Sequence, residues 1–205
     1  IDDNSQDGTG RIADALRDKN PTRVWTMHRP GKMGLGTAYV AGFKYALANS
    51  FDFIFEMDAD FSHPPEKLVE MAEALETCDV VHGSRYVQGG GVDERWPVWR
   101  KALSGFGNFY ARTILGLPTH DVTGGYRMWR TRTIQSLPLD RIRSNGYVFQ
   151  VELAYITYRL GFATHEVPIY FADRRWGKSK MSLRIQLEAA LRVWQLRWQY
   201  RDLHP

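Results

Sequence analysis

The sequence predicts an α/β fold in which a mainly parallel sheet is flanked by helices. Short apolar runs typical of strands alternate with helical periodicity through the first half of the chain. Strands and helices that alternate in this way form parallel sheets with helices on both faces. The chain has 205 residues, 43% of them apolar, which suits one compact domain with a sizeable core. We therefore expect residues 1–205 to form a single domain.

The first half of the chain has three expected strands, at residues 23–28, 51–57 and 78–84, and three expected helices, at 8–19, 35–49 and 64–77. The third helix carries apolar residues at spacings of three and four, namely Leu68, Met71, Ala72 and Leu75. Pro64 and Pro65 suit its first turn, where a missing N–H costs nothing. The chain opens without Met and inside the motif IDDNSQDGTG, so we expect the first strand of the sheet to precede residue 1.

The second half predicts helices at 98–116, 147–160 and 183–200 and a strand at 164–171. The segment HDVTGGYRMWRT, which follows the first of these helices, receives no element. Neither a repeat nor a linker divides the chain, and so we do not split the domain.

The bulk composition limits the classes of protein. The formal charge is +4, and Arg and Lys become denser after residue 95. This asymmetry indicates an anionic partner, either phosphate or a membrane surface, unless it is only a solvated basic face. A single cysteine, Cys78, excludes a disulfide framework and is expected to be a small core residue in a reducing compartment. No stretch approaches the roughly 20 apolar residues of a membrane span, which predicts a soluble or peripheral protein.

Two aspartates, Asp58 and Asp60, follow the apolar run at 51–57. Ligands of parallel sheets bind at the carboxyl ends of strands, where this pair falls. Two carboxylates there need a counter-charge, and a hard divalent cation with oxygen ligands, Mg²⁺ or Mn²⁺, is the usual one. The alternative is a pair of surface loop acids, one of which caps the following helix.

The same D-x-D-x-S pattern resembles the nucleophile motif of haloacid-dehalogenase phosphatases. That family also needs a downstream Lys and an acidic G-D-x-x-x-D loop, and no such loop follows residue 85. We therefore favour another assignment.

The ordered motifs resemble the family 2 glycosyltransferases of the Rossmann-like GT-A fold, most closely the dolichol-phosphate or polyprenol-phosphate mannose synthases. The motifs that carry the resemblance are IDDNSQDGTG, RPGKMGLGTAYVAGFKYA, MDADFSHPPE, GSRY, WRKALSGFGNFYAR, DVTGGYRMWR, GYVFQVELAY and EVPIYFADRRWGKSKMS. Each motif is weak alone, but together they cover nearly the whole chain in the order of the family. The resemblance implies a nucleotide-sugar half at about 1–95 and an acceptor half at about 96–205.

For the donor, the resemblance implies that Asp2 and Asp3 lie by the nucleoside. It implies that Arg29, Lys32, Gly34 and Gly36 lie by the diphosphate. Asp58 and Asp60 would hold the metal, and Ser62 stands where the family more often has a glutamine ligand. Turn acids and turn glycines are the competing interpretation of Asp2, Asp3, Gly34 and Gly36.

For the acceptor, the resemblance implies that Arg85, Arg100 and Ser104 bind the lipid phosphate, because the planar guanidinium fork suits phosphate oxygens. It also implies that Arg174, Ser179 and Lys180 belong to a loop that closes over donor and acceptor, with Gly177 as its hinge. Asp121 would face the sugar hydroxyls, and Glu152 would support the same pocket or a basic partner, unless both are structural acids. We interpret His63 and His82 as structural.

The implied reaction is an inverting transfer of mannose from GDP-mannose to a polyprenyl or dolichyl phosphate. A phosphate monoester is already ionised at neutral pH and needs no catalytic base. We expect no nucleic-acid partner, and peripheral association with the cytoplasmic face of a membrane or with a membrane-anchoring partner. The last helix has Leu187, Leu191, Trp194 and Trp198 on one face, which predicts either interfacial binding or packing on the core.

Three alternatives stay open. A polyprenyl-phosphate glucosyltransferase would use UDP-glucose. A processive polysaccharide synthase would carry Q-x-x-R-W, and QLRW at 195–198 is one residue short of that motif. A non-catalytic nucleotide-sugar-binding domain would have no reason to carry an acceptor loop.

Overall fold

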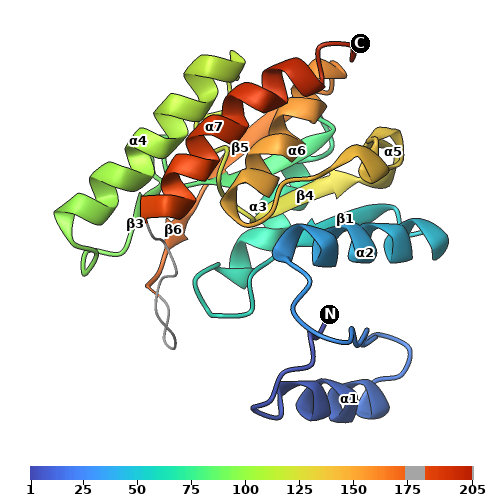
Figure 1. The fold of residues 1–205 in the computed structure, drawn as a ribbon. Helices are drawn as coiled ribbons and strands as arrows, with labels where there is room; N and C mark the ends of the chain where they lie inside the picture. The colour runs from blue at the N-terminus through green and yellow to red at the C-terminus, as the bar shows by residue number, and fades with distance from the viewer. Residues whose placement is uncertain (174–182, 205) are drawn as a thin grey trace.

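The computed structural model describes residues 1–173 and 183–204. Its main sheet has four strands in the order β1-β4-β2-β5 (Figure 1). The strands are β1 (Phe53–Glu56), β2 (Val80–Ser84), β4 (Arg127–Arg130) and β5 (Thr164–Pro168). β2 and β5 are parallel, whereas β4 is antiparallel to both β1 and β2. A separate parallel pair joins β3 (Gly91–Val92) to β6 (Tyr170–Phe171).

The sheet is therefore mixed rather than mainly parallel: β1, β2 and β5 run in one direction, and β4 runs against them. β4 lies within the segment that received no element, and it inserts between two strands of the first half. Its residues alternate between the two faces of the sheet, and Arg127 and Trp129 are both fully buried. A buried arginine breaks the apolar pattern by which a strand is recognised, and so β4 was missed.

Nine helical segments lie in the described ranges. They are α1 (Thr9–Lys19), α2 (Leu35–Ala48), η1 (Pro65–Lys67), α3 (Leu68–Ala74), α4 (Val98–Leu115), α5 (Thr131–Ser136), η2 (Leu139–Arg141), α6 (Tyr147–Arg159) and α7 (Leu183–Gln199). No helix in these ranges is long and apolar enough to cross a membrane.

Two apolar clusters cover the two faces of the sheet. The larger one joins Trp129 and Val80 to buried residues of α2, α4, α6 and α7. The smaller one joins Val81 and Met128 to residues of α3, and the predicted core residue Cys78 belongs to it. The expectation of helices on both faces is thus confirmed. In Figure 1, α1 lies apart from these layers, at the edge of the molecule.

Three of the expected elements are reduced or divided in the structure. The strand expected at 23–28 is reduced to one parallel bridge between Asp2 and His28. The helix expected at 64–77 begins as the 3₁₀ turn η1 and continues as α3. The strand expected at 164–171 divides into β5 and β6, because Ile169 donates to Ser84 O of β2 while its carbonyl accepts from Gly91 of β3.

Candidate active site

The loop after β1 holds Asp58 and Asp60 in a defined conformation. The Asp58 backbone N–H donates to His63 Nδ1 over 3.1 Å, and the Tyr39 hydroxyl of α2 lies 3.5 Å from Asp58 Oδ1. Ser62 donates to Asp60 Oδ1 from its backbone N over 3.1 Å and from its hydroxyl over 2.5 Å. Both carboxylates therefore lie at the carboxyl end of β1, as the sequence predicted.

His63 of this loop packs against two aromatic residues. Its ring stacks on Tyr126, with ring centroids 4.7 Å apart, and meets the edge of Phe171 at 5.2 Å. The Tyr126 hydroxyl donates to the Pro64 carbonyl. His63 is thus buried and fixes the path of the loop, as expected of a structural residue.

The Asp58 and Asp60 carboxylates can provide oxygen ligands to a hard cation. The described residues contain no group of three His, Cys, Asp or Glu side chains that could hold a metal on its own. The Ser62 hydroxyl already donates to Asp60. Such a pair fits Mg²⁺ or Mn²⁺, because these ions keep several waters and bind substrate phosphates alongside one or two carboxylates.

Asp3 and Arg29 form a two-pronged ion pair on the donor side. Arg29 Nε lies 2.5 Å from Asp3 Oδ1, and Nη2 lies 2.6 Å from Oδ2. This contact, more than any other, lowers the pKa of Asp3 below its usual value. Arg29 also donates to the Thr37 hydroxyl over 2.8 Å. Two sequence-predicted donor residues therefore contact each other at the start of α2.

Two glycines allow α2 to begin close to the loop before α6. Gly34 has φ of 98°, and a Cβ there would lie 2.5 Å from Asn145 Oδ1. A Cβ on Gly36 would lie 2.5 Å from the Ser144 carbonyl oxygen. Only glycine accommodates both approaches. Lys32 is exposed and makes no side-chain hydrogen bond or ion pair with the described residues.

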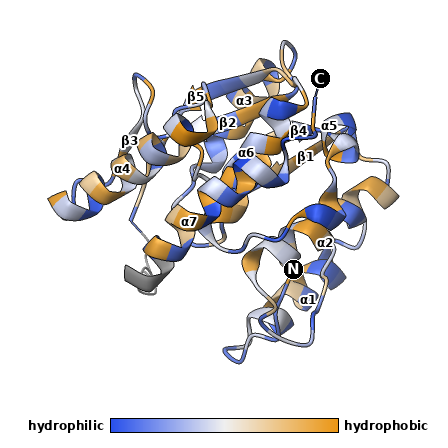
Figure 2. Cartoon of the chain, turned by 45° about the horizontal axis from the view of Figure 1, so that its top comes forward, coloured by the Kyte–Doolittle hydropathy of each residue, from blue (hydrophilic) through white to orange (hydrophobic). Residues whose placement is uncertain are grey.

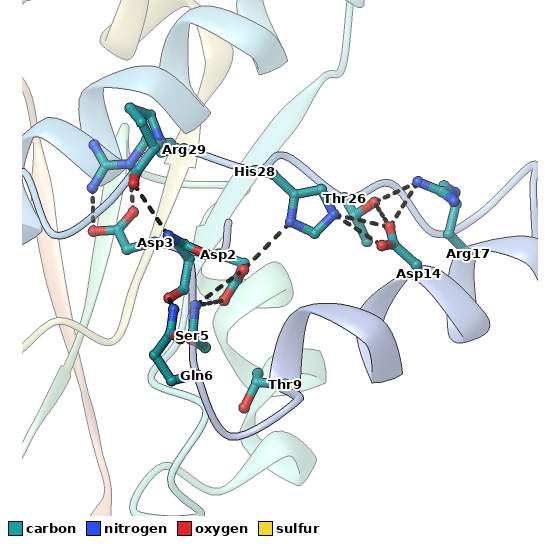
Figure 3. A network of polar contacts seen from close by, with 12 residues as sticks. Asp2, Asp3, Ser5, Gln6, Thr9, Asp14, Arg17, Thr26, His28 and Arg29 are labelled. Atoms are coloured by element: carbon teal, nitrogen blue, oxygen red, sulfur yellow. Dashed lines mark hydrogen bonds and ion pairs between the residues drawn. The ribbon is translucent and has the colours of Figure 1, made fainter.

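Asp2 belongs to a second polar network, drawn in Figure 3. Its carboxylate lies 3.3 Å from His28 Nδ1 and accepts from the Ser5 backbone. The other ring nitrogen of His28 lies 3.0 Å from Asp14 Oδ1. Arg17 and Thr26 complete the network by donating to Asp14 over 2.8 Å each.

On the acceptor side, Arg85 and Asp121 form a buried ion pair. Arg85 Nε and Nη2 lie 2.6 and 2.7 Å from the two Asp121 oxygens, and the Arg85 backbone N–H also donates to Asp121. Burial alone would raise the pKa of Asp121, but the Arg85 guanidinium outweighs it and lowers that pKa. The residues predicted for lipid phosphate and for sugar hydroxyls are thus direct partners.

Ser104 and Arg100 lie one turn apart on α4 and reach the same region. The Tyr86 hydroxyl donates to Ser104 Oγ over 2.6 Å. Arg100 stacks on Trp96, with its guanidinium carbon 3.6 Å from the ring centroid, and donates to Asp173 over 3.0 Å. Asp173 is the first residue of the predicted acceptor loop, DRRWGKSK. Arg174, Gly177, Ser179 and Lys180 of that loop lie outside the described residues.

Glu152 is a buried hub between α6 and α7. It accepts from the Ser144 backbone over 2.8 Å and from the Tyr200 hydroxyl over 2.7 Å. Arg192 Nη2 lies 3.6 Å from its carboxylate. Arg192 is thus a basic partner of Glu152. The bond to Ser144 fixes the loop before α6, which packs on Gly34 and Gly36.

Sequence reasoning missed a buried polar row across the sheet. In the strand register, Glu56 pairs with Arg127, and Arg127 pairs with His82. Glu56 accepts from Trp129 Nε1 over 2.6 Å and from Gln150 Nε2 over 3.0 Å, and burial raises its pKa to about 7. Burial lowers the pKa of His82 well below its usual value. The only sequence signal was an acid at the end of the apolar run FIFE.

Comparison with known proteins places the chain in a family. The family model described as "Glycosyl transferase family 2" matches residues 1–137. An undecaprenyl-phosphate mannosyltransferase from Micrococcus luteus is 47% identical over 97% of this chain and 83% of that protein. A polyprenol monophosphomannose synthase from Mycolicibacterium smegmatis is 44% identical over 96% of this chain and 75% of that protein.

A solved structure shares the fold. Glucosyl-3-phosphoglycerate synthase from Mycobacterium tuberculosis, in complex with Mn²⁺, uridine diphosphate and glucosyl-3-phosphoglycerate, matches with a TM-score of 0.59 at 19% identity. The match covers 97% of this chain and 67% of that chain. This likeness concerns the fold and supports the GT-A architecture. Since the family match covers residues 1–137 and the two relatives match nearly the whole sequence, the chain belongs to glycosyl transferase family 2.

Proposed function

We propose that this chain is a polyprenyl-phosphate mannosyltransferase, which moves mannose onto the phosphate of a membrane lipid. The observation that carries the proposal is identity of 44% and 47% to two enzymes of this kind across at least 96% of the chain. The donor we propose is GDP-mannose. The acceptor we propose is an undecaprenyl, dolichyl or related polyprenyl phosphate.

The donor binds, in this proposal, around the first half of α2. Asp2 and Asp3 contact the nucleoside, and the Arg29 guanidinium lies beside the diphosphate. Two contacts support a single donor site: Arg29 bonds Thr37 at the start of α2, and Tyr39 of the same helix approaches Asp58. The helix α2 thus connects Arg29, predicted for the diphosphate, to Asp58, predicted for the metal.

Asp58 and Asp60 hold Mg²⁺ or Mn²⁺ in this proposal. A cation bound there would neutralise the charge that grows on the diphosphate as the sugar leaves. The hydrogen bonds of Ser62 orient the Asp60 carboxylate, so Ser62 acts on the site through Asp60.

Arg85, Arg100 and Ser104 bind the acceptor phosphate in this proposal. The phosphate oxygen is already an anion near neutral pH, because the second pKa of a phosphate monoester is about 6. The protein then has to align this oxygen with the anomeric carbon, which permits attack with inversion without a general base. The contacts of Arg100 with Asp173 and of Tyr86 with Ser104 hold these side chains on one side of α4.

An exposed apolar face on α4 and α7 supports docking to a lipid surface. The side chains of this α4–α7 face are between 49% and 69% exposed, namely Trp99, Phe106, Leu187, Leu191, Trp194 and Trp198. Trp194 Nε1 donates to the Tyr110 hydroxyl over 3.1 Å, and Phe106 packs on the Tyr110 ring at 6.1 Å, so the two helices form one surface. Figure 2 shows apolar segments along both helices.

Aromatic residues and arginines on such a face bind the interface of a bilayer. Since α4 also carries Arg100 and Ser104, docking by this face would bring the phosphate of a membrane lipid next to the proposed acceptor residues. We propose that the chain acts at a membrane surface in this way. Its placement at the cytoplasmic face stays a prediction.

The test is a donor panel with purified protein, Mn²⁺ or Mg²⁺, and undecaprenyl phosphate in vesicles. GDP-mannose is expected to be the donor that gives lipid-linked sugar. Asp60→Asn is expected to lower kcat by about 100-fold or more, because the stabilisation of the leaving group by the metal is lost. Asp140→Asn, at an exposed acid paired with Lys44, is the matched control and should retain activity. Turnover of UDP-glucose in place of GDP-mannose would refute the mannose assignment.

A further inference from the structure

Two consecutive acids lie opposite two consecutive bases in the donor half. Asp2 contacts His28, and Asp3 contacts Arg29 (Figure 3). The backbone fixes this pairing, because Asp2 N donates to Met27 O and Arg29 N donates to Asp2 O, each over 2.8 Å. The two pairs differ in one chemical respect: the guanidinium is always charged, whereas the imidazole titrates near neutral pH.

Both ring nitrogens of His28 face carboxylates. Nδ1 lies 3.3 Å from Asp2 Oδ2, and Nε2 lies 3.0 and 3.1 Å from the two Asp14 oxygens. A neutral imidazole donates from one nitrogen only, while an ionised carboxylate only accepts. The bridge from Asp2 to Asp14 is therefore complete only when the ring carries both protons.

The Asp2 carboxylate, at one end of this bridge, is closely packed. Its side chain is only 11% exposed. A Cβ on Gly10 of α1 would lie 2.7 Å from Asp2 Oδ2 and 3.3 Å from His28 Cε1. The first turn of α1 thus closes on the pair, and a carboxylate that lost its His28 contact would keep the Ser5 backbone contact but have little room to replace His28.

We propose that protonated His28 is a positioning residue that holds Asp2 in the geometry needed to bind a nucleoside diphosphate, so that nucleotide affinity falls when His28 loses its proton. The inference rests on the proposed function, since it takes Asp2 to contact the donor nucleotide.

The charges around His28 determine the direction of the effect. Asp2 and Asp14 contact the ring directly, and Arg17 of α1 pairs with Asp14. The carboxylates of Asp7 and of Asp3, which pairs with Arg29, interact with the charge of Asp2. The hydrogen bond to Asp14, followed by that to Asp2, raises the pKa of His28 above its usual 6.5. The bridge is thus fully formed below pH 6.5 and is lost as pH rises through the raised pKa.

The experiment measures the Kd of GDP, with UDP as a second probe, by calorimetry with Mn²⁺ from about pH 5.5 to about pH 8.5. The wild type should lose affinity with rising pH by about two- to fivefold more than His28→Gln, as expected for one partly exposed ion pair. The midpoint of this difference should equal the midpoint of the His28 Cε1–H titration observed by NMR. Since the nucleotide ionises equally for every variant at a given pH, comparing variants at the same pH cancels its contribution to the change in Kd.

A second variant leaves His28 in place. Asp14→Asn should lower the pKa of His28 and move both midpoints to lower pH together, which a merely structural role for His28 would not produce. His165→Gln, at an exposed histidine of β5, is the matched control and should keep the wild-type profile.

The proposal is overturned if His28→Gln keeps the wild-type pH profile, or if Asp14→Asn shifts the NMR midpoint alone. Failure to bind either nucleotide at any pH would instead overturn the proposed function, and the inference with it.

Discussion

The Asp3–Arg29 pair of the donor half and the Asp121–Arg85 pair of the acceptor half have nearly the same geometry. Each is a two-pronged contact, with distances of 2.5 and 2.6 Å in the first and 2.6 and 2.7 Å in the second. Their surroundings differ, because the Asp3 side chain is 25% exposed and the Asp121 side chain is fully buried. Equal geometry therefore does not imply an equal contribution to stability.

The buried pair is also more fully bonded. Asp121 accepts from the backbone N–H groups of Arg85 and Gly124, and Arg85 Nη2 also donates to Thr123. The Asp121 carboxylate cannot be solvated without its partner, whereas the Asp3 carboxylate is partly exposed to water. We infer from this difference that the acceptor-side pair contributes more to the stability of the fold and keeps Arg85 fixed beside the acceptor, whereas the donor-side pair can yield to a ligand.

The largest effect is expected from Asp121→Asn. This change leaves the buried Arg85 guanidinium without its counter-charge, and the free energy of unfolding should fall by about 3–5 kcal/mol. Urea denaturation followed by circular dichroism measures it. The double variant Arg85→Met with Asp121→Leu should recover much of the loss, because replacing both partners by apolar groups removes the unpaired charge. A loss below about 1 kcal/mol would mean that water reaches Asp121 and that the comparison fails.

The pH dependence of stability sharpens the same contrast. The pKa of Asp121 is lowered below 3.8, since Arg85 outweighs burial, so its contribution is present above pH 3.8 and is lost as pH falls through the lowered pKa. The wild type should therefore lose stability on acidification, and Asp121→Asn should show a shallower decline over the same range. The measurement is the urea midpoint between about pH 7 and about pH 3. Parallel curves for the two proteins would show that the pKa of Asp121 is the same in the folded and unfolded states.

The sequence motifs named candidate residues but not the contacts between them. The motifs located Arg85 and Asp121 separately, but their contact depends on how the loop after β2 meets the loop before β4, and β4 itself was not predicted. The pairing of Asp3 with Arg29 depends in the same way on the bridge between Asp2 and His28. Such contacts arise from tertiary packing, which a local pattern does not encode.

The buried polar row across the sheet could not be predicted for the same reason. Glu56, His82 and Arg127 are buried, and each lies in a segment whose apolar pattern it interrupts. A polar residue within a strand is ordinarily assigned to the solvent face. Strand register is what brings these three side chains together, and register was not predictable without β4.

The smallest effect is expected from Asp3→Asn. The pair is partly exposed, and its loss should lower the free energy of unfolding by at most about 1 kcal/mol. Salt provides a stricter comparison, because the Debye length shrinks to about 3 Å at 1 M ionic strength and screens exposed charges far more than buried ones. Urea denaturation is measured in low salt and in 1 M NaCl. The added salt should reduce the difference in free energy of unfolding between wild type and Asp3→Asn toward zero, while the difference for Asp121→Asn persists. If salt diminished both differences equally, the two pairs would have the same effective exposure in solution, and the division between a yielding donor side and a fixed acceptor side would have to be abandoned.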